Sequence, residues 1–283
     1  MKPTRRRLSS PRERSNREAS TRLWVASLGL VGIVLFSGWL VRLAITENPR
    51  LGPDLCREGE QPGGESLIFL DSTDPWNPIQ REVLRQQFRL IQDSLPRFHR
   101  VHLYSLDPGQ PDLRPPLLSL CNPGRVGDLR DIPIVGPAAY SNPEAVRERW
   151  ERGFVGELDS TFQVEVDRPQ ATQSPLMETL RGAAIEVFGT TPASGQTRTV
   201  HIFSDLLQNS DRFSVYGGKE LTPAAGRDLA DLSVLGTTAL DGAKVHLYLV
   251  DRGQVGLSAL VEFWDAYLGT QNAIVMQVRR IEG

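Results

Sequence analysis

The segment Ser66-Leu67-Ile68-Phe69-Leu70-Asp71-Ser72-Thr73-Asp74-Pro75-Trp76 is an apolar run that ends in carboxylate and hydroxyl side chains. This pattern is typical of a buried parallel strand whose end delivers polar groups to the carboxyl edge of a sheet. A second run, residues 199–205, also ends in a carboxylate, Asp205. Ligands of open α/β sheets bind at this edge. We therefore expect Asp71 and Asp205 to lie near one point, although they are far apart in the sequence.

Strand-like and helix-like segments alternate along the chain. Apolar runs predict strands at residues 66–70, 101–106, 199–204, 243–250 and 273–281, with a short edge strand at 117–120. Helical spacing predicts helices at residues 77–95, 143–158, 174–188, 221–235 and 257–268, and the expected helix caps are Asn77, Ser174 and either Ser141 or Asn142. Residues 107–143 form a proline-rich insertion. The alternation predicts an α/β domain over residues 65–283, with a doubly wound, mostly parallel sheet and helices on both faces.

A basic arm and an apolar segment precede this domain. Residues 1–22 carry eight Lys or Arg residues against two Glu residues, and residues 23–41 carry no charge. This uncharged run is long enough for a membrane span, so we predict a transmembrane signal-anchor helix at residues 23–45. A cleavable signal peptide is the alternative, but its apolar core would be shorter, and Arg42 gives a poor cleavage context before Ala44. Residues 46–64 are rich in Pro, Gly and charge and predict a linker.

The charge distribution predicts orientation and partner class. The one predicted membrane span makes this a single-pass protein. Because basic residues stay on the cytoplasmic side, we expect its N-terminus in the cytoplasm and its domain in the bacterial periplasm or outside the cell. The chain beyond the arm is mildly acidic, which argues against nucleic acid as its main ligand.

The chain has two cysteines, Cys56 in the predicted linker and Cys121 after the predicted edge strand. Both lie on the outer side of the predicted membrane span, where an oxidising compartment allows a disulfide. Two cysteines do not establish a bond, because geometry decides whether they pair. The sequence therefore leaves open a disulfide and a pair of free buried thiols.

The order and character of these segments resemble a von Willebrand factor A domain. Members of that family hold a metal-ion-dependent adhesion site in three loops at the carboxyl edge of the sheet. Their motif begins Asp-x-Ser-x-Ser, and here Asp71 and Thr73 match the first two positions while Pro75 replaces the third. Ser174 stands for the Thr of the second loop, and Asp205 matches the Asp of the third. The resemblance covers roughly residues 65–283 and implies the metal ligands Asp71, Thr73, Ser174 and Asp205.

The predicted ligand set suits Mg²⁺, which prefers oxygen ligands from carboxylates, hydroxyls and water. Pro75 removes one expected hydroxyl, and Asp74 stands next to it as a replacement. The alternative is a site without metal, in which Asp71 and Asp205 cap helices or accept hydrogen bonds from loop amides.

These observations favour a binding or scaffold module over an enzyme. The chain has no Gly-x-Ser-x-Gly elbow and no Gly-x-x-x-x-Gly-Lys loop, and its four histidines lack the clustered spacing of a zinc site. We expect a membrane-anchored protein-binding module, with a partner in a membrane or envelope complex and Mg²⁺ completing the contact. The alternatives are a metal-dependent hydrolase that uses Asp71 and Asp205, and a structural envelope-complex subunit with an inactive metal site.

Overall fold

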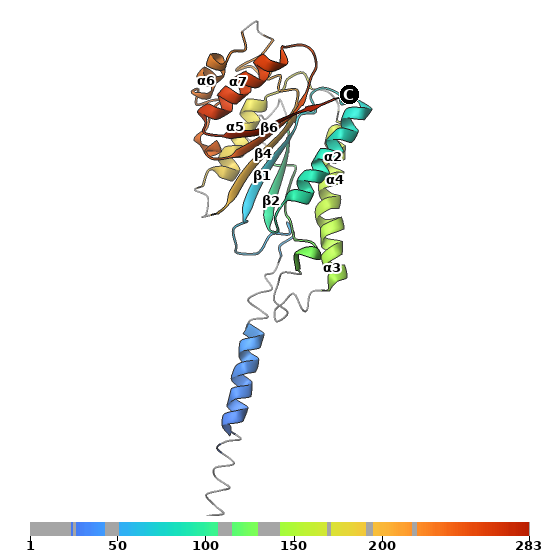
Figure 1. Ribbon diagram of the computed structural model, residues 1–283, viewed down its shortest axis with the longest axis vertical. Coiled ribbons are helices and arrows are strands. Elements are labelled where there is room, and N and C mark those ends of the chain that lie inside the picture. The colour runs from blue at the N-terminus through green and yellow to red at the C-terminus, as the bar shows by residue number, and fades with distance from the viewer. Residues whose placement is uncertain are drawn as a thin grey trace, which may run out of the picture. The chain divides into compact units, whose positions relative to one another are not determined.

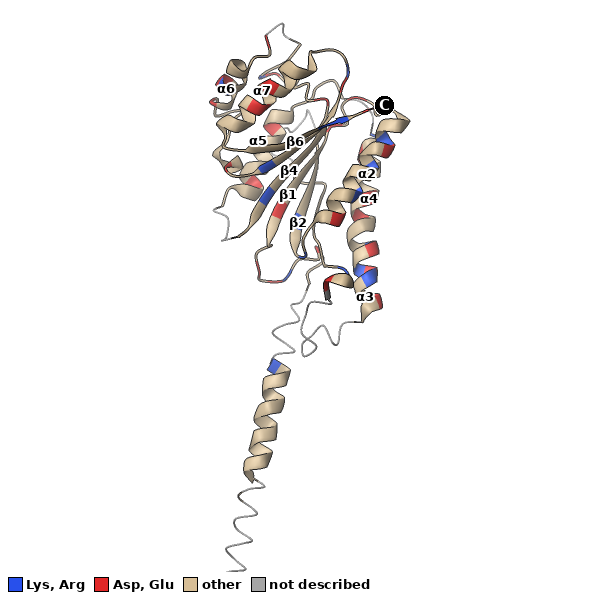
Figure 2. Cartoon of the chain, in the orientation of Figure 1, with Lys and Arg blue, Asp and Glu red and all other residues tan. Residues whose placement is uncertain are grey.

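The computed structural model describes Trp24 and residues 27–42, 51–106, 115–129, 142–168, 171–190, 195–216 and 220–282. The chain divides into two units, residues 1–49 with 132–141, and residues 50–131 with 142–283. In the first unit, residues 27–42 are helical, with exposed apolar side chains and charge at one end only (Figure 2). None of the helices in the described ranges is long and apolar enough to cross a membrane. The predicted span includes residues 23, 25, 26 and 43–45, which lie outside those ranges.

The second unit contains one six-stranded sheet in the order β3-β2-β1-β4-β5-β6 (Figure 1). Its strands are β1 Gly64–Leu70, β2 His99–Ser105, β3 Leu118–Cys121, β4 Thr197–Ser204, β5 Lys244–Val250 and β6 Ile274–Ile281. All neighbouring pairs are parallel except β2 with the edge strand β3, which is antiparallel. The predicted α/β class with a mostly parallel sheet is therefore confirmed.

Helices cover both faces of the sheet. Their bounds are α2 Pro78–Ser94, α3 Pro143–Glu148, a π-helical segment Arg149–Gly156, α4 Glu157–Val166, α5 Leu176–Phe188, α6 Pro223–Ala230 and α7 Leu257–Thr270, with 3-10 turns at Gly127–Leu129 and Thr238–Leu240. Alternate side chains of β1 enter two cores. Leu67 and Phe69 pack with α5 and α7, and Ile68 and Leu70 pack with α2 and α4. Both faces of the central strands are buried, which explains their continuous apolar runs.

Two helix boundaries differ from the predictions. The helix expected at residues 143–158 continues through the π-helical segment to Val166, because Phe162 and Val166 extend its buried face. The helix expected at residues 221–235 ends at Ala230, because the chain reverses there and Gly236 lies against the backbone of Ala230, where a Cβ would clash. The predicted caps Asn77 and Asn142 do accept backbone N–H groups of their helices.

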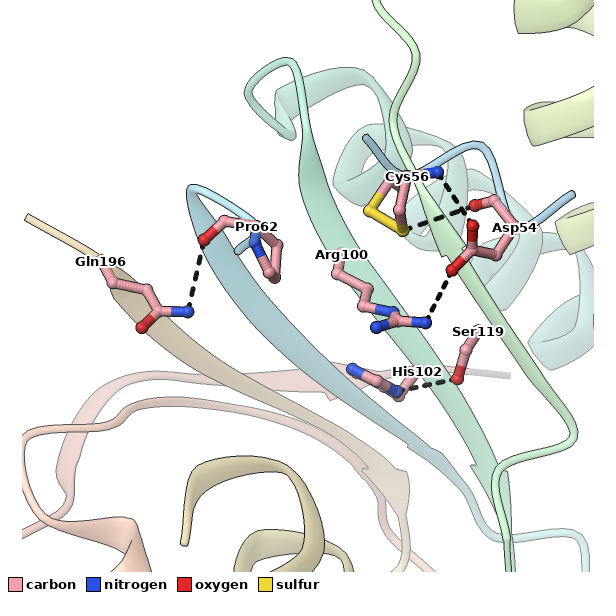
Figure 3. The surroundings of a disulfide bond; sticks show 8 residues. Asp54, Cys56, Pro62, Arg100, His102, Ser119 and Gln196 are labelled. Atoms are coloured by element: carbon pink, nitrogen blue, oxygen red, sulfur yellow. Dashed lines mark hydrogen bonds and ion pairs between the residues drawn. A yellow bond between two sulfur atoms is a disulfide. The ribbon is translucent and has the colours of Figure 1, made fainter. Parts of the chain in front are cut away.

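A disulfide joins Cys56 to Cys121 at the end of β3. The backbone N–H of Cys121 donates to the carbonyl of Asp54, and the Asp54 carboxylate accepts from the Arg100 guanidinium of β2 at 2.8 Å (Figure 3). Residues 54–56, in the predicted linker, are thus fastened to the β2–β3 edge.

Candidate functional site

Asp71 is the first residue after β1 and is 4% exposed. Its backbone N–H donates to the carbonyl of Phe203 on β4, which fixes it between the two central strands. Its Oδ1 accepts from the backbone N–H of Thr73 at 3.1 Å and from the Thr73 hydroxyl at 2.6 Å. The loop that follows β1 is therefore held by hydrogen bonds to the Asp71 carboxylate, and these bonds keep the Thr73 hydroxyl at the edge of the sheet.

Two serine hydroxyls from distant segments donate to the other oxygen of this carboxylate. Asp71 Oδ2 accepts from Ser174 Oγ at 2.9 Å and from Ser204 Oγ at 2.6 Å. The prediction that Ser174 caps α5 is wrong. The N-cap position is Pro175, which makes no side-chain cap bond. The Ser174 hydroxyl instead points to Asp71, and paired backbone bonds with Asn209 hold it there.

Asp205 follows β4 beside this cluster and is 7% exposed. Its Oδ1 accepts from the backbone N–H of Leu207 at 2.9 Å, and its Oδ2 lies 3.7 Å from Nε of Arg252. Burial, and then the nearby charge of Asp71, raise the pKa of Asp205 to about 7. Arg252 thus places a positive charge beside a poorly solvated carboxylate, and its Nη1 also donates to the carbonyl of Pro75 at 3.2 Å.

Three of the four predicted ligands line one small cavity of about 240 Å³. Thr73, Ser174 and Asp205 line it, and Asp71 lies directly behind them through its hydrogen bonds. Asp74, Asn209 and Tyr216 complete the polar wall. The sheet therefore brings together at its carboxyl edge all four side chains that the sequence nominated.

The donor set suits a hard cation. Two carboxylates and the hydroxyl oxygens of Thr73 and Ser174 are the oxygen ligands that Mg²⁺ prefers, with water filling the remaining positions. Within the described ranges, no three His, Cys, Asp or Glu side chains are grouped so that they could hold a metal ion. The hydroxyls are therefore essential to any ion site here. Both carboxylates also accept loop amides, the role that a site without metal would give them.

Two residues of this site were missed in the sequence. Ser204 is the last residue of β4 and precedes Asp205; its place at a strand end was a usable signal. Arg252 comes two residues after β5, the next strand to reach the same edge. That position became informative only once the strand order placed β5 beside β4.

Replacing Asp205 by asparagine is expected to raise the free energy of unfolding near pH 8 and to change it little near pH 4. Because the folded-state pKa of Asp205 is raised, the charged form destabilises the fold at high pH. This penalty begins to shrink as the pH falls below about 7 and is gone near the ordinary pKa of 3.8. Asparagine keeps the acceptor for Leu207 and removes the charge. Urea unfolding across this pH range measures the effect.

Asp251→Asn is the matched control, since Asp251 lies at the same edge but binds Arg280 at 2.9 Å. The prediction is wrong if Asp205→Asn is less stable than the unsubstituted protein at high pH. It is also wrong if the free energy of unfolding of Asp205→Asn depends on pH in the same way as that of the unsubstituted protein.

Comparison with known protein families finds no family model that matches the chain, and comparison with curated proteins finds no match.

Proposed function

We propose that this chain is a membrane-anchored module, similar to a von Willebrand factor A domain, that binds another protein through the carboxyl edge of its sheet outside the cytoplasm. The observation that carries the proposal is the convergence of Thr73, Ser174 and Ser204 on Asp71, with Asp205 beside them at one small cavity. The three loops that supply these residues follow β1, precede α5 and follow β4.

The topology supports this resemblance. A parallel sheet that is wound outward from β1 in both directions, with an antiparallel edge strand β3, places the loops after β1 and β4 next to each other. That neighbourhood is the switch point at which ligands of open α/β sheets bind.

Mg²⁺ is the ion that this donor set fits, and Asp71, Thr73, Ser174 and Asp205 would hold it. A bound Mg²⁺ supplies an open position for a carboxylate of the partner. The chain's own residues orient that contact, because the hydrogen bonds to Asp71 hold the Thr73 and Ser174 hydroxyls at the cavity. Arg252 is the competing cation, and its contact with Asp205 is the observation that favours the second candidate function, a structural envelope subunit with an inactive metal site.

The proposed localisation rests on two features. The uncharged run at residues 23–41 and the basic arm support a membrane anchor with the domain outside the cytoplasm. The Cys56–Cys121 disulfide fits an oxidising compartment such as the periplasm.

Titration of the full chain in detergent with Mg²⁺ tests the ion site. We expect Mg²⁺ to raise the melting temperature, because a ligand at about 100 times its Kd stabilises the folded state by about 2.7 kcal/mol. Asp205→Asn should abolish this rise and Asp251→Asn should keep it. Arg252→Gln should strengthen it, because the competing cation is gone.

Cross-linking in membranes of the native host, with and without a chelator, tests the partner contact. Loss of a specific cross-linked partner with Asp205→Asn, but not with Asp251→Asn, supports the binding module. If Mg²⁺ leaves the melting temperature unchanged and the partner is retained by Asp205→Asn, the inactive-site subunit is the better account.

A further inference from the structure

On the face of the sheet that α2 covers, the side chains change from polar to apolar along the strands. Near the carboxyl ends, alternate side chains on this face are apolar, as a buried parallel sheet requires. Near the amino ends they are polar. This second set comprises Ser66 of β1, His99 of β2, Thr197, Thr199 and His201 of β4, Lys244, His246 and Tyr248 of β5, and Gln277 and Arg279 of β6. Tyr248 also packs in the core against Phe203. A row of hydrophilic side chains across five strands is nevertheless not what the core of a buried parallel sheet requires.

These side chains line a cavity of about 400 Å³ between the sheet and α2, which we call the histidine cleft. Helix α2 contributes its wall through Gln87, Leu90, Ile91 and Ser94. The cleft lies along the amino half of the strands, whereas the cavity lined by Thr73, Ser174 and Asp205 lies at their carboxyl ends. The two are therefore separate sites. Its volume falls within the range of small-molecule pockets.

The floor of the cleft is ordered by its own contacts. His99 Nε2 lies 2.8 Å from Ser66 Oγ, and His201 Nδ1 lies 3.4 Å from the Tyr248 hydroxyl. The rings of His201 and His246 stack with centroids 5.0 Å apart. His99 and His201 are 3% and 7% exposed, so their positions are fixed before any ligand arrives.

The floor is neutral at pH 7. Burial lowers the pKa of His99 to about 4 and that of His201 to about 3. A neutral imidazole offers one donor and one acceptor nitrogen, which suits the hydroxyl groups of a ligand.

The two charged side chains among the described residues that line the cleft, Lys244 and Arg279, are both positive. Lys244 is exposed at one side, and Arg279 donates from Nη1 to Gln87 Oε1 at 2.8 Å, which fixes the guanidinium between β6 and α2. Among the described residues that line the cleft, none is Asp or Glu. The β5–β6 register pairs Lys244 with Ile274 and Tyr248 with Arg279, so the two cations lie at different levels of the cleft. Arg279 is the group that matches a phosphate, because Gln87 already holds its guanidinium and arginine binds phosphate oxygens in a favourable planar geometry.

We propose that the histidine cleft binds a small organic phosphate whose body carries hydroxyl groups. Arg279 contacts the phosphate, and the histidines, serine, threonines and Gln277 on the floor hydrogen-bond the hydroxyls. Lys244, at the amino end of β5, adds a positive charge to the cleft without contacting the phosphate. The proposal is independent of the Asp71 site and does not require a metal.

Calorimetry on the full chain in detergent, in phosphate-free buffer, tests the proposal with ribose 5-phosphate, inorganic phosphate and ribose as probes. We expect ribose 5-phosphate to bind more tightly than inorganic phosphate, and ribose to bind most weakly, because it lacks the charge. The His99, His201 and His246 ring signals in NMR spectra should shift with ribose 5-phosphate.

Arg279→Gln should weaken ribose 5-phosphate binding by about tenfold or more, because it removes a charged hydrogen bond. Lys244→Gln should weaken it less, because it removes only a more distant charge. Arg280→Gln is the matched control: Arg280 is adjacent in β6, binds Asp251 and is not part of the lining. Melting curves of all three variants should match that of the unsubstituted protein, since the replaced side chains lie at the surface. The proposal is overturned if ribose 5-phosphate gives neither heat nor histidine shifts at about 10 mM, or if Arg280→Gln weakens binding as much as Arg279→Gln does.

Discussion

Replacing both Cys56 and Cys121 by serine is expected to lower the free energy of unfolding by about 4 kcal/mol. The disulfide closes a loop with a sequence separation of 65 residues, and a cross-link of that length removes much conformational entropy from the unfolded chain. For a domain of this size the melting temperature should fall by roughly 10 °C. Thermal unfolding of the oxidised protein and of the double variant measures the difference.

Reduction of the unsubstituted protein supplies the control for this experiment. The reduced protein should melt close to the double variant, because both lack the cross-link. A double variant that melts within about 2 °C of the oxidised protein, which corresponds to less than about 1 kcal/mol, would show that the bond contributes little to the fold.

Replacing Trp264 by alanine is expected to cost about 4 kcal/mol. The side chain is fully buried, and its ring meets Tyr267 and Phe263 edge to face. Its Nε1 donates to the carbonyl of Leu206 at 2.9 Å. Leu206 follows Asp205 and has φ +61, a left-handed conformation that leucine seldom adopts. The indole therefore both fills the core and holds the loop that carries Asp205.

Trp264→Phe separates these two roles, because phenylalanine keeps much of the packing and loses the hydrogen bond. We expect urea unfolding to show a loss of about 1 to 2 kcal/mol for this variant. Equal losses for alanine and phenylalanine would contradict the expectation, since they would assign the whole effect to the hydrogen bond.

Sequence patterns predicted the elements of this fold better than its contacts. The apolar run before Asp71 and that before Asp205 were recognisable because both faces of a central parallel strand are buried. The caps Asn77 and Asn142 were recognisable because capping is local. The ends of α4 and α6 were not, since they depend on packing and on the close approach of Gly236 to Ala230.

The candidate sites show the same limit. Asp71, Thr73, Ser174 and Asp205 were nominated by a motif. Three of them line one cavity, and Asp71 accepts hydrogen bonds from Thr73 and Ser174 behind it. Arg252 was not nominated, because its contact with Asp205 depends on strand order. The histidine cleft was invisible for a similar reason: its residues come from five strands and acquire a common surface only when the register aligns His201 with His246 and Gln277.

The disulfide also determines how the domain carries mechanical load. Tension applied through the segment before residue 51 would otherwise peel β1 from the middle of the sheet, one hydrogen bond after another. The covalent link joins Cys56 to Cys121 of β3, ahead of Gly64 in the chain, and would pass part of that force to the edge strand. If the chain is anchored before residue 51, as we propose, this bond would reduce the load that a pull on the anchor places on β1 and on the Asp71 loop that follows it.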